Sequence, residues 1–419
     1  MQRSTFRLVV ATGAAIGLAA LAGCGGSSTP ADSDSGTVVF WDTSGPNENP
    51  VFARLAQGCA QQGGYKVNIE TVAFDQARNN FKTAAQGGQG PDVLRTDVSW
   101  VAEFAKNGLI ADLSDTDVTK DAGDYNPIAL GSTKYEGKTY GLPQVIDTLG
   151  LYYNKKLLAA AGVTPPKTYD EIKAAAAKLG GDKTFFINNL GYYSLPFIYS
   201  NGADLIDAGG KKITVNSAKA VEGWQAAKGL LDAKADRTSL DTNNSYTNMN
   251  AAFNAGEVAM IVNGPWDYVT YTKGAAFADP SNLGVAAVPG PTGPGKGPQG
   301  GHDYTIRQGT KAKTSSIKFI QCMSSTESQI EVSKSLGLLP TRKSAADSAD
   351  AKANPGVAAF GPLLVDNTQA RPVIPEYASL FDPLGTAWSD VLAGTKDPKT
   401  ALDAAAKAYQ PLLPGYTIG

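Results

Sequence analysis

The stretch FNAGEVAMIVNGPWDY, residues 253–268, places an apolar run directly before Asn-Gly-Pro-Trp. The run VAMIV is apolar without alternation, which is typical of a strand covered on both faces in a sheet flanked by helices. Gly256 predicts the end of a preceding helix, because glycine readily adopts the left-handed conformation at a helix terminus. Gly264 and Pro265 predict the end of the strand, since proline has no N–H for a sheet ladder. Trp266 is therefore expected just beyond the carboxyl end of a strand, where open α/β sheets bind ligands.

Strand and helix patterns alternate along the rest of the chain. Strands are expected at 37–41 and 65–74, and helices at 50–61 and 168–180. Thr168 and Glu171 have the spacing of a capping box at the start of the last of these helices. Strands that alternate with helices indicate an α/β fold with parallel βαβ units.

The size and the net charge of the chain indicate how many domains it has and which class of partner it does not bind. With 419 residues, the chain exceeds the length that one hydrophobic core usually supports, so two domains are expected. The net charge is only −2. Nucleic acid is therefore excluded as a partner, because phosphate binding requires a concentrated cationic surface.

The N-terminus has the pattern of an export signal. Arginines within the first seven residues precede an apolar stretch, 8–22, which is too short to span a bilayer comfortably. The Leu-Ala-Gly-Cys that ends at Cys24 resembles the lipobox of bacterial lipoproteins, in which the cysteine is lipidated and becomes the mature N-terminus. We therefore predict a signal peptide at 1–23, a lipid-anchored flexible tether at 24–36, and a location on the outer face of the cell membrane.

Signatures of catalysis and of cofactor binding are missing from the sequence. His302 is the single histidine, which excludes a histidine-based zinc site and restricts any Ser-His-Asp triad to that residue. The Gly-rich segment 87–90 lacks the spacing and the lysine of a phosphate loop. We predict a binding protein, not an enzyme, with no cofactor and no metal.

Several stretches, taken in order, resemble the sugar-binding components of ABC importers, especially the maltose and maltodextrin type found as lipoproteins in Gram-positive bacteria. The resemblance extends from about residue 37 to the end of the chain. It is carried by VVFWDTSG (38–45), GPDVLRTDVSW (90–100), KTYGLPQVIDTLGLYYNK (138–155), AAFNAGEVAMIVNGPW (251–266), GGHDY (300–304), LLPTRKSA (338–345) and RPVIPEYASLF (371–381).

The resemblance implies two α/β lobes with a hinge and an interlobe ligand cleft, as in periplasmic binding proteins. Lobe one is expected at 37–145 plus 301–340, and lobe two at 148–300 plus 345–419, with crossings near 144–147, 300–303 and 341–344. It also implies an oligosaccharide ligand, with maltose and maltooligosaccharides foremost, membrane subunits of an ABC permease as partners, and a monomer attached to the membrane only by its lipid.

The resemblance also assigns roles to particular residues. Trp266 matches a tryptophan that stacks on sugar rings, and Asp147 matches a carboxylate that accepts sugar hydroxyls. One of Tyr192 and Tyr193 is expected to face the ligand and the other to lie in the core. The remaining candidates are Asp97, Glu376, Tyr377, Phe381, His302, Asp303, Asp42, Ser44, Glu48 and Arg95. Phe381 departs from the tryptophan often found at its position.

Two cysteines remain after Cys24 is assigned to the lipid. The family architecture places Cys59 and Cys322 on helices of one lobe, and export makes a disulfide between them permissible. Two buried free thiols are the alternative.

Other functions remain open at this point. The ligand can be another oligosaccharide. The adjacent Tyr192 and Tyr193 would also suit a ferric-ion binder, because phenolates coordinate iron. A secreted glycoside hydrolase would use a similar sugar-shaped cleft.

Overall fold

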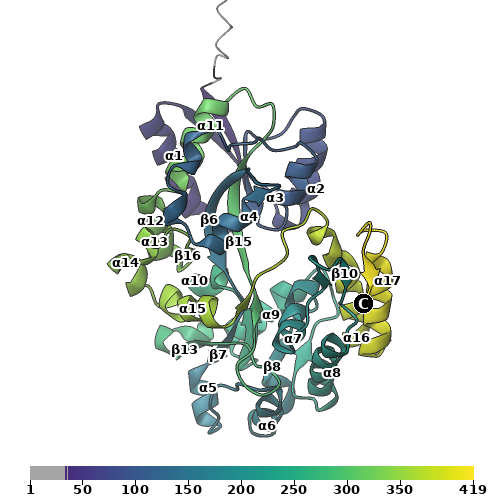
Figure 1. The fold of residues 1–419 in the computed structure, drawn as a ribbon. Coiled ribbons are helices and arrows are strands. Elements are labelled where there is room, and N and C mark those ends of the chain that lie inside the picture. Colours follow the sequence, from purple (N-terminus) through teal and green to yellow (C-terminus); the bar gives the residue numbers. More distant parts are fainter. Residues whose placement is uncertain (1–33, 35) are drawn as a thin grey trace, which may run out of the picture. The chain divides into compact units, whose positions relative to one another are not determined.

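Two β-sheets organise the part of the chain that the structure, a computed structural model, describes: Asp34 and residues 36–419 (Figure 1). The predicted signal peptide, Cys24 and nearly all of the predicted tether lie outside these residues. Within the described part, no helix is both long and apolar enough to cross a membrane.

The first sheet has six strands in the order β16-β6-β15-β3-β1-β2. Their bounds are Leu339–Pro340, Gly141–Asp147, Gly300–Ile306, Val93–Asp97, Thr37–Asp42 and Lys66–Thr71. The surrounding helices include α1 (Asn49–Gly63), α2 (Phe74–Gln86), α3 (Val101–Lys106), α11 (Lys313–Met323) and α12 (Thr326–Leu336). We call this sheet with these helices lobe one.

The second sheet has five strands in the order β11-β8-β12-β7-β13. Their bounds are Arg237–Thr238, Phe185–Ile187, Met260–Asn263, Gly150–Asn154 and Leu283–Ala286. The surrounding helices include α5 (Lys155–Ala160), α6 (Tyr169–Leu179), α7 (Leu195–Ser200), α8 (Ala218–Asp232), α9 (Ser245–Ala255), α16 (Phe381–Leu392) and α17 (Pro398–Tyr409). We call this sheet with these helices lobe two.

Shorter elements complete the fold. The helices are α4 (Pro127–Ser132), α10 (Tyr268–Tyr271), α13 (Lys343–Ala346), α14 (Ala349–Ala353) and α15 (Pro355–Asp366). The strands are β4 (Lys134–Tyr135), β5 (Lys138–Thr139), β9 (Ile206–Asp207), β10 (Lys212–Ile213), β14 (Gly297–Pro298), β17 (Thr368–Gln369) and β18 (Thr417–Ile418).

The local predictions around β12 are confirmed. The helix before it, α9, ends at Gly256, whose φ of 73° lies in the left-handed region that favours glycine. The strand is covered on both faces, because Met260 and Ile261 are fully buried. In lobe two, the capping box of Thr168 and Glu171 is present in both directions at the start of α6. The α/β, two-lobed fold class predicted from the sequence is also confirmed.

The parallel pairing predicted from the sequence is present, since β1 pairs in parallel with β2 and β3, and β8 with β12, but each sheet also contains antiparallel strands. In lobe one β15 runs antiparallel to β3 and β6, and in lobe two β7 runs antiparallel to β12 and β13. The reason is the route of the chain. β1, β3 and β12 end at the junction between the lobes, whereas β7 and β15 enter their sheets from that junction and therefore run in the opposite direction.

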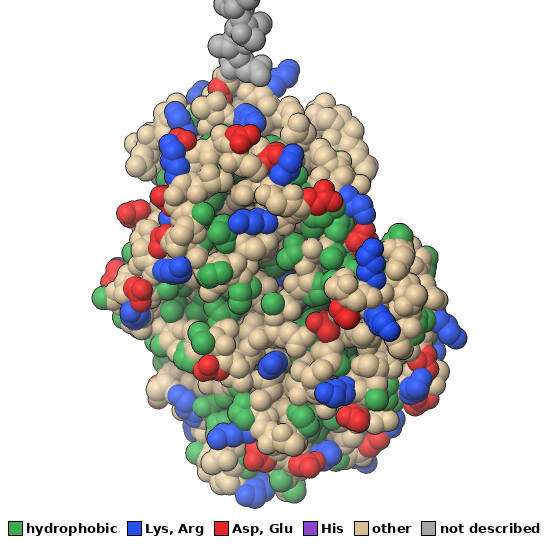
Figure 2. Space-filling model, in the orientation of Figure 1, with side chains coloured by type: hydrophobic (Ala, Val, Ile, Leu, Met, Phe, Trp, Pro, Cys, Tyr) green, Lys and Arg blue, Asp and Glu red, His purple; other side chains and the backbone are tan. Residues whose placement is uncertain are grey.

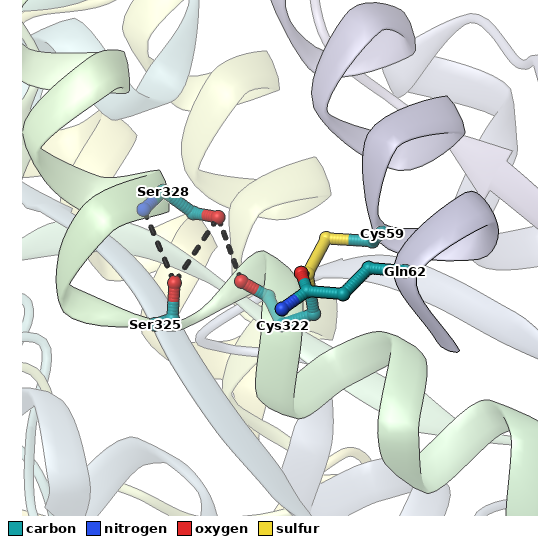
Figure 3. The surroundings of a disulfide bond; sticks show 5 residues. All are labelled: Cys59, Gln62, Cys322, Ser325 and Ser328. Carbon is teal, nitrogen blue, oxygen red and sulfur yellow. Dashed lines mark hydrogen bonds between the residues drawn. A yellow bond between two sulfur atoms is a disulfide. The ribbon is translucent and has the colours of Figure 1, made fainter.

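A disulfide joins Cys59 of α1 to Cys322 of α11 in lobe one (Figure 3). The S–S distance is 2.00 Å, and the two cysteines are 263 residues apart in the sequence. The bond therefore ties the first helix of the fold to a helix that follows the last return of the chain to lobe one.

Candidate binding site

The ends of three strands bring acidic side chains to the junction of the lobes. Asp42 ends β1, Asp97 ends β3 and Asp147 ends β6. The sheet register pairs Gly300, the first residue of β15, with Asp147, and His302 with Asp97. Only residues 148–149 separate β6 of lobe one from β7 of lobe two, so Asp147 lies on a crossing between the lobes.

The carboxylate of Asp147 is the least satisfied of these groups. Asp147 is only 5% exposed, yet its carboxylate makes no hydrogen bond or ion pair with any described residue. A Cβ added to Gly300 would lie 2.1 Å from Asp147 Oδ1 and 3.1 Å from the Tyr192 hydroxyl oxygen. Both polar groups therefore converge on the bare backbone of Gly300.

Burial raises the pKa of Asp147 to about 7. Arg371 and Arg95 oppose this shift, whereas Asp97 and Glu48 add to it. The group thus changes its ionisation near neutral pH, because a carboxylate loses hydration when it is enclosed. It is poised to accept hydrogen bonds from a polar molecule placed beside it.

Two buried guanidinium groups accompany the acids. Arg95 Nε donates to Gln144 Oε1 at 2.8 Å, and the Arg95 guanidinium lies 5.2 Å from the centre of the Phe52 ring. Arg371 Nε donates to the Gln299 carbonyl oxygen at 2.6 Å.

Arg371 connects the acidic and aromatic parts of the site. Its Nη2 lies 3.8 Å from Asp97 Oδ1, and its guanidinium carbon lies 5.7 Å from the centre of the Tyr192 ring. The sequence prediction did not include Arg371, although the stretch RPVIPEYASLF that supplied Glu376, Tyr377 and Phe381 begins with it.

The loop after β1 holds the carboxyl groups of Asp42 and Glu48 in place. Ser44 donates to Asp42 through its backbone N–H at 3.0 Å and its hydroxyl at 2.8 Å. Glu48 accepts the Gly45 N–H at 3.0 Å. Burial raises the pKa of Glu48, and Arg95 partly opposes that rise. Asp42, Ser44 and Glu48 are all nearly buried.

Aromatic side chains lie beside the charged groups. Trp266 is partly buried and packs against core residues of both lobes. Its Nε1 donates to the Tyr246 hydroxyl at 2.7 Å, and Tyr246 donates in turn to Asp267. In lobe two, the rings of Phe381 and Tyr192 lie 6.2 Å apart between centres.

His302 contributes a neutral ring. Neither ring nitrogen has a hydrogen-bond partner among the described residues, and the ring meets Phe74 edge to face at 5.8 Å. Burial lowers the pKa of His302 well below its ordinary value, and Arg95 and Arg371 lower it further.

Three predicted residues are not brought to this cluster as free groups. Tyr193 is nearly buried and donates its hydroxyl to Asn263 Oδ1 at 3.0 Å. Tyr377 is fully buried, and its hydroxyl lies 3.0 Å from that of Tyr199. Asp303 is buried and accepts the Ser132 hydroxyl at 3.0 Å. Their polar atoms are satisfied within the protein.

Polar contacts also join the lobes on either side of the cluster. Glu376, another predicted residue, pairs with Lys106 of α3 at 2.6 Å. Arg78 of α2 donates to Ser379 Oγ at 2.7 Å. Asn47 donates to the Thr270 hydroxyl of α10 at 2.6 Å. These three contacts join the lobes in the conformation that the structure shows.

Known proteins resemble this chain in sequence and in fold. The sequence model of the family described as bacterial extracellular solute-binding protein matches residues 54–359. The solved GacH receptor of Streptomyces glaucescens, studied unliganded and in complex with acarbose and an acarbose homolog, is 41% identical, with a TM-score of 0.87 over 91% of this chain and 99% of that one.

Two curated relatives cover almost as much of the chain. The maltooligosaccharide ABC transporter solute-binding lipoprotein of Streptococcus pneumoniae strain R6 is 28% identical over 92% of each chain. The maltotriose-binding protein of Pyrococcus abyssi is 27% identical over 91% of this chain and 82% of its own.

Proposed function

Because the chain belongs to the family of bacterial extracellular solute-binding proteins, we propose that it captures maltose or a maltooligosaccharide between its lobes and delivers it to the membrane subunits of an ABC importer. The observation that carries this proposal is the unpartnered, buried carboxylate of Asp147 beside the Tyr192 ring. The names of the pneumococcal and archaeal relatives, and the acarbose complexes of the GacH receptor, support the same class of ligand.

The chemistry of the cluster suits a sugar. Pyranose rings present apolar C–H faces to aromatic rings and hydroxyls to planar polar groups around their edge. Trp266, Tyr192 and Phe381 supply the rings. Asp147, Arg371 and Arg95 supply the planar polar groups, so one ligand ring would be held by stacking and hydrogen bonds together.

A thermal-shift screen tests this function directly. Maltose, maltotriose, maltotetraose and oligosaccharides of other linkage are added separately to the purified protein. A sugar present at one hundred times its dissociation constant should stabilise the fold by about 2.7 kcal/mol. The same screen on Asp147→Asn should show a smaller shift, whereas Asp236→Asn is the matched control. Asp236 is also a buried carboxyl without a hydrogen-bond partner among the described residues, but it lies next to β11, at the edge of the lobe two sheet.

The screen and two further assays distinguish this function from the alternative functions. A shift with an oligosaccharide of other linkage alone would assign that sugar as the ligand. Release of reducing ends from maltodextrin would indicate a hydrolase. Colour on iron loading would indicate a ferric-ion binder. The absence of a shift with every sugar would contradict the proposal.

We further propose that the protein acts as a monomer held on the outer face of the cell membrane by lipid on Cys24. Cys24→Ala should release the protein from membranes or block its maturation. A variant that is still processed normally and remains in the membrane fraction would contradict this anchor.

A further inference from the structure

The buried charges at the junction of the lobes do not balance. The face shown in Figure 2 carries acidic and basic side chains interspersed over its surface. In contrast, the junction holds four carboxylates and two guanidinium groups, each with a side chain that is mostly buried: Asp42, Glu48, Asp97, Asp147, Arg95 and Arg371. With four carboxyl groups and two guanidinium groups, two of the acids have no cationic partner of their own, and burial raises the pKa of both Glu48 and Asp147. An uncompensated buried charge is unfavourable, so the cluster favours a cation.

The described residues do not supply that cation. Among the described residues His302 is the only further basic group at the cluster, and burial lowers its pKa well below the ordinary value, with Arg95 and Arg371 lowering it further. No group of three or more His, Cys, Asp or Glu side chains in the described part of the chain is arranged to hold a metal ion. The compensating charge must therefore come from a proton or from the ligand.

Asp147 is where a ligand cation would be received. The other acids already have hydrogen-bond donors: Ser44 for Asp42, Gly45 for Glu48 and Ser99 for Asp97. Asp147 has none among the described residues, and its Oδ1 lies over the bare backbone of Gly300. A sugar hydroxyl can donate a hydrogen bond there, but it leaves the charge in place. A protonated amine supplies both the hydrogen bond and the charge.

We propose that the site prefers an oligosaccharide that carries a protonatable amine over a neutral oligosaccharide of the same length, with Asp147 as the partner of the amine. This inference rests on the proposed sugar-binding function and names the chemical class of its preferred ligand.

The test compares acarbose, whose chain contains a secondary amine, with maltotetraose, a neutral chain of the same length. Calorimetric titrations are made with the wild-type protein, with Asp147→Asn and with the control Asp236→Asn. A charge-assisted hydrogen bond should make acarbose bind at least about tenfold more tightly to the wild-type protein. The preference should collapse toward equal affinity in Asp147→Asn and persist in Asp236→Asn.

The wild-type comparison can overturn the inference even if a variant fails to fold. Equal affinities, tighter binding of maltotetraose, or binding only of neutral members of the sugar panel would each reject the amine preference and leave the sugar-binding function intact. A preference that survives unchanged in folded Asp147→Asn would reject Asp147 as the partner. If no sugar of the panel binds, the proposed function itself fails.

Discussion

Gly300→Ala is expected to weaken sugar binding by displacing the Asp147 carboxylate, while every side chain proposed to contact the sugar keeps its identity. The added Cβ would lie 2.1 Å from Asp147 Oδ1, where real contacts are at least about 3 Å, so the carboxylate would have to move by about 1 Å. The Tyr192 hydroxyl, 3.1 Å from the same point, would also be crowded. Gly300 is not among the residues with positive φ, so alanine should fit the backbone there.

The size of the effect follows from the hydrogen bond at stake. A hydrogen bond to a charged group contributes about 1.5–3 kcal/mol, which corresponds to a roughly ten- to one-hundredfold rise in dissociation constant. Calorimetric titration with the tightest sugar of the panel measures this change. Urea denaturation is the companion measurement, because overpacking of a folded site costs about 1–3 kcal/mol of stability.

Gly293→Ala is the matched control, since a Cβ at Gly293 would meet nothing within 4 Å. Its sugar affinity should equal that of the wild-type protein. If folded Gly300→Ala binds the sugar as tightly as the wild-type protein does, the carboxylate of Asp147 does not contact the ligand and the site described above is misplaced.

Three further results are expected. Trp266→Ala should weaken sugar binding by at least about thirtyfold with a smaller loss of stability, whereas unchanged affinity with a loss of about 3–5 kcal/mol in unfolding free energy would make Trp266 a core residue. Burial raises the pKa of Asp147 to about 7, and neutral sugars are expected to donate hydrogen bonds to its ionised form. The affinity for neutral sugars should therefore fall below pH 7, by up to about tenfold per pH unit. Calorimetry on Asp147→Asn should give an affinity that does not change with pH. The charged groups that face Asp147 are Arg371 and Arg95, which lower its pKa, and Asp97 and Glu48, which raise it. If the wild-type affinity did not change with pH, Asp147 would not titrate on binding. Replacing both Cys59 and Cys322 by serine should lower the unfolding free energy by about 2–5 kcal/mol and leave sugar affinity unchanged, and equal urea midpoints would show that the bond does not stabilise the fold.

The sequence predicted the elements around β12 because local rules operate there. Gly256 ends α9 through its left-handed φ, and the apolar run that follows is buried on both faces. The same rules could not show that β7 and β15 run against their neighbours. Strand direction depends on which lobe the chain comes from, and no local pattern records that.

Arg371 shows a second limit of the sequence. Arg371 lies just after β17, more than 270 residues beyond Asp97 in the sequence. Only the fold brings Arg371 Nη2 to 3.8 Å from Asp97 Oδ1. Tyr192 and Tyr193 are adjacent in the sequence, so the pattern indicated two aromatic groups without saying which was free. The structure distinguishes them by one hydrogen bond, from the Tyr193 hydroxyl to Asn263.

The reversed strands also connect ligand binding to the relative position of the lobes. Asp147 ends β6, with residues 148–149 between it and β7 of lobe two, and Gly300 begins β15 as the chain returns to lobe one. A ligand that hydrogen-bonds to Asp147 over Gly300 would therefore contact both crossings at once, while stacking on Tyr192 in lobe two. We expect such a ligand to favour the arrangement in which Lys106 meets Glu376 and Asn47 meets Thr270, because groups from both lobes would contact it there. Placing the polar groups on the crossings makes affinity and closure depend on the same contacts, so a change confined to Gly300 should alter both.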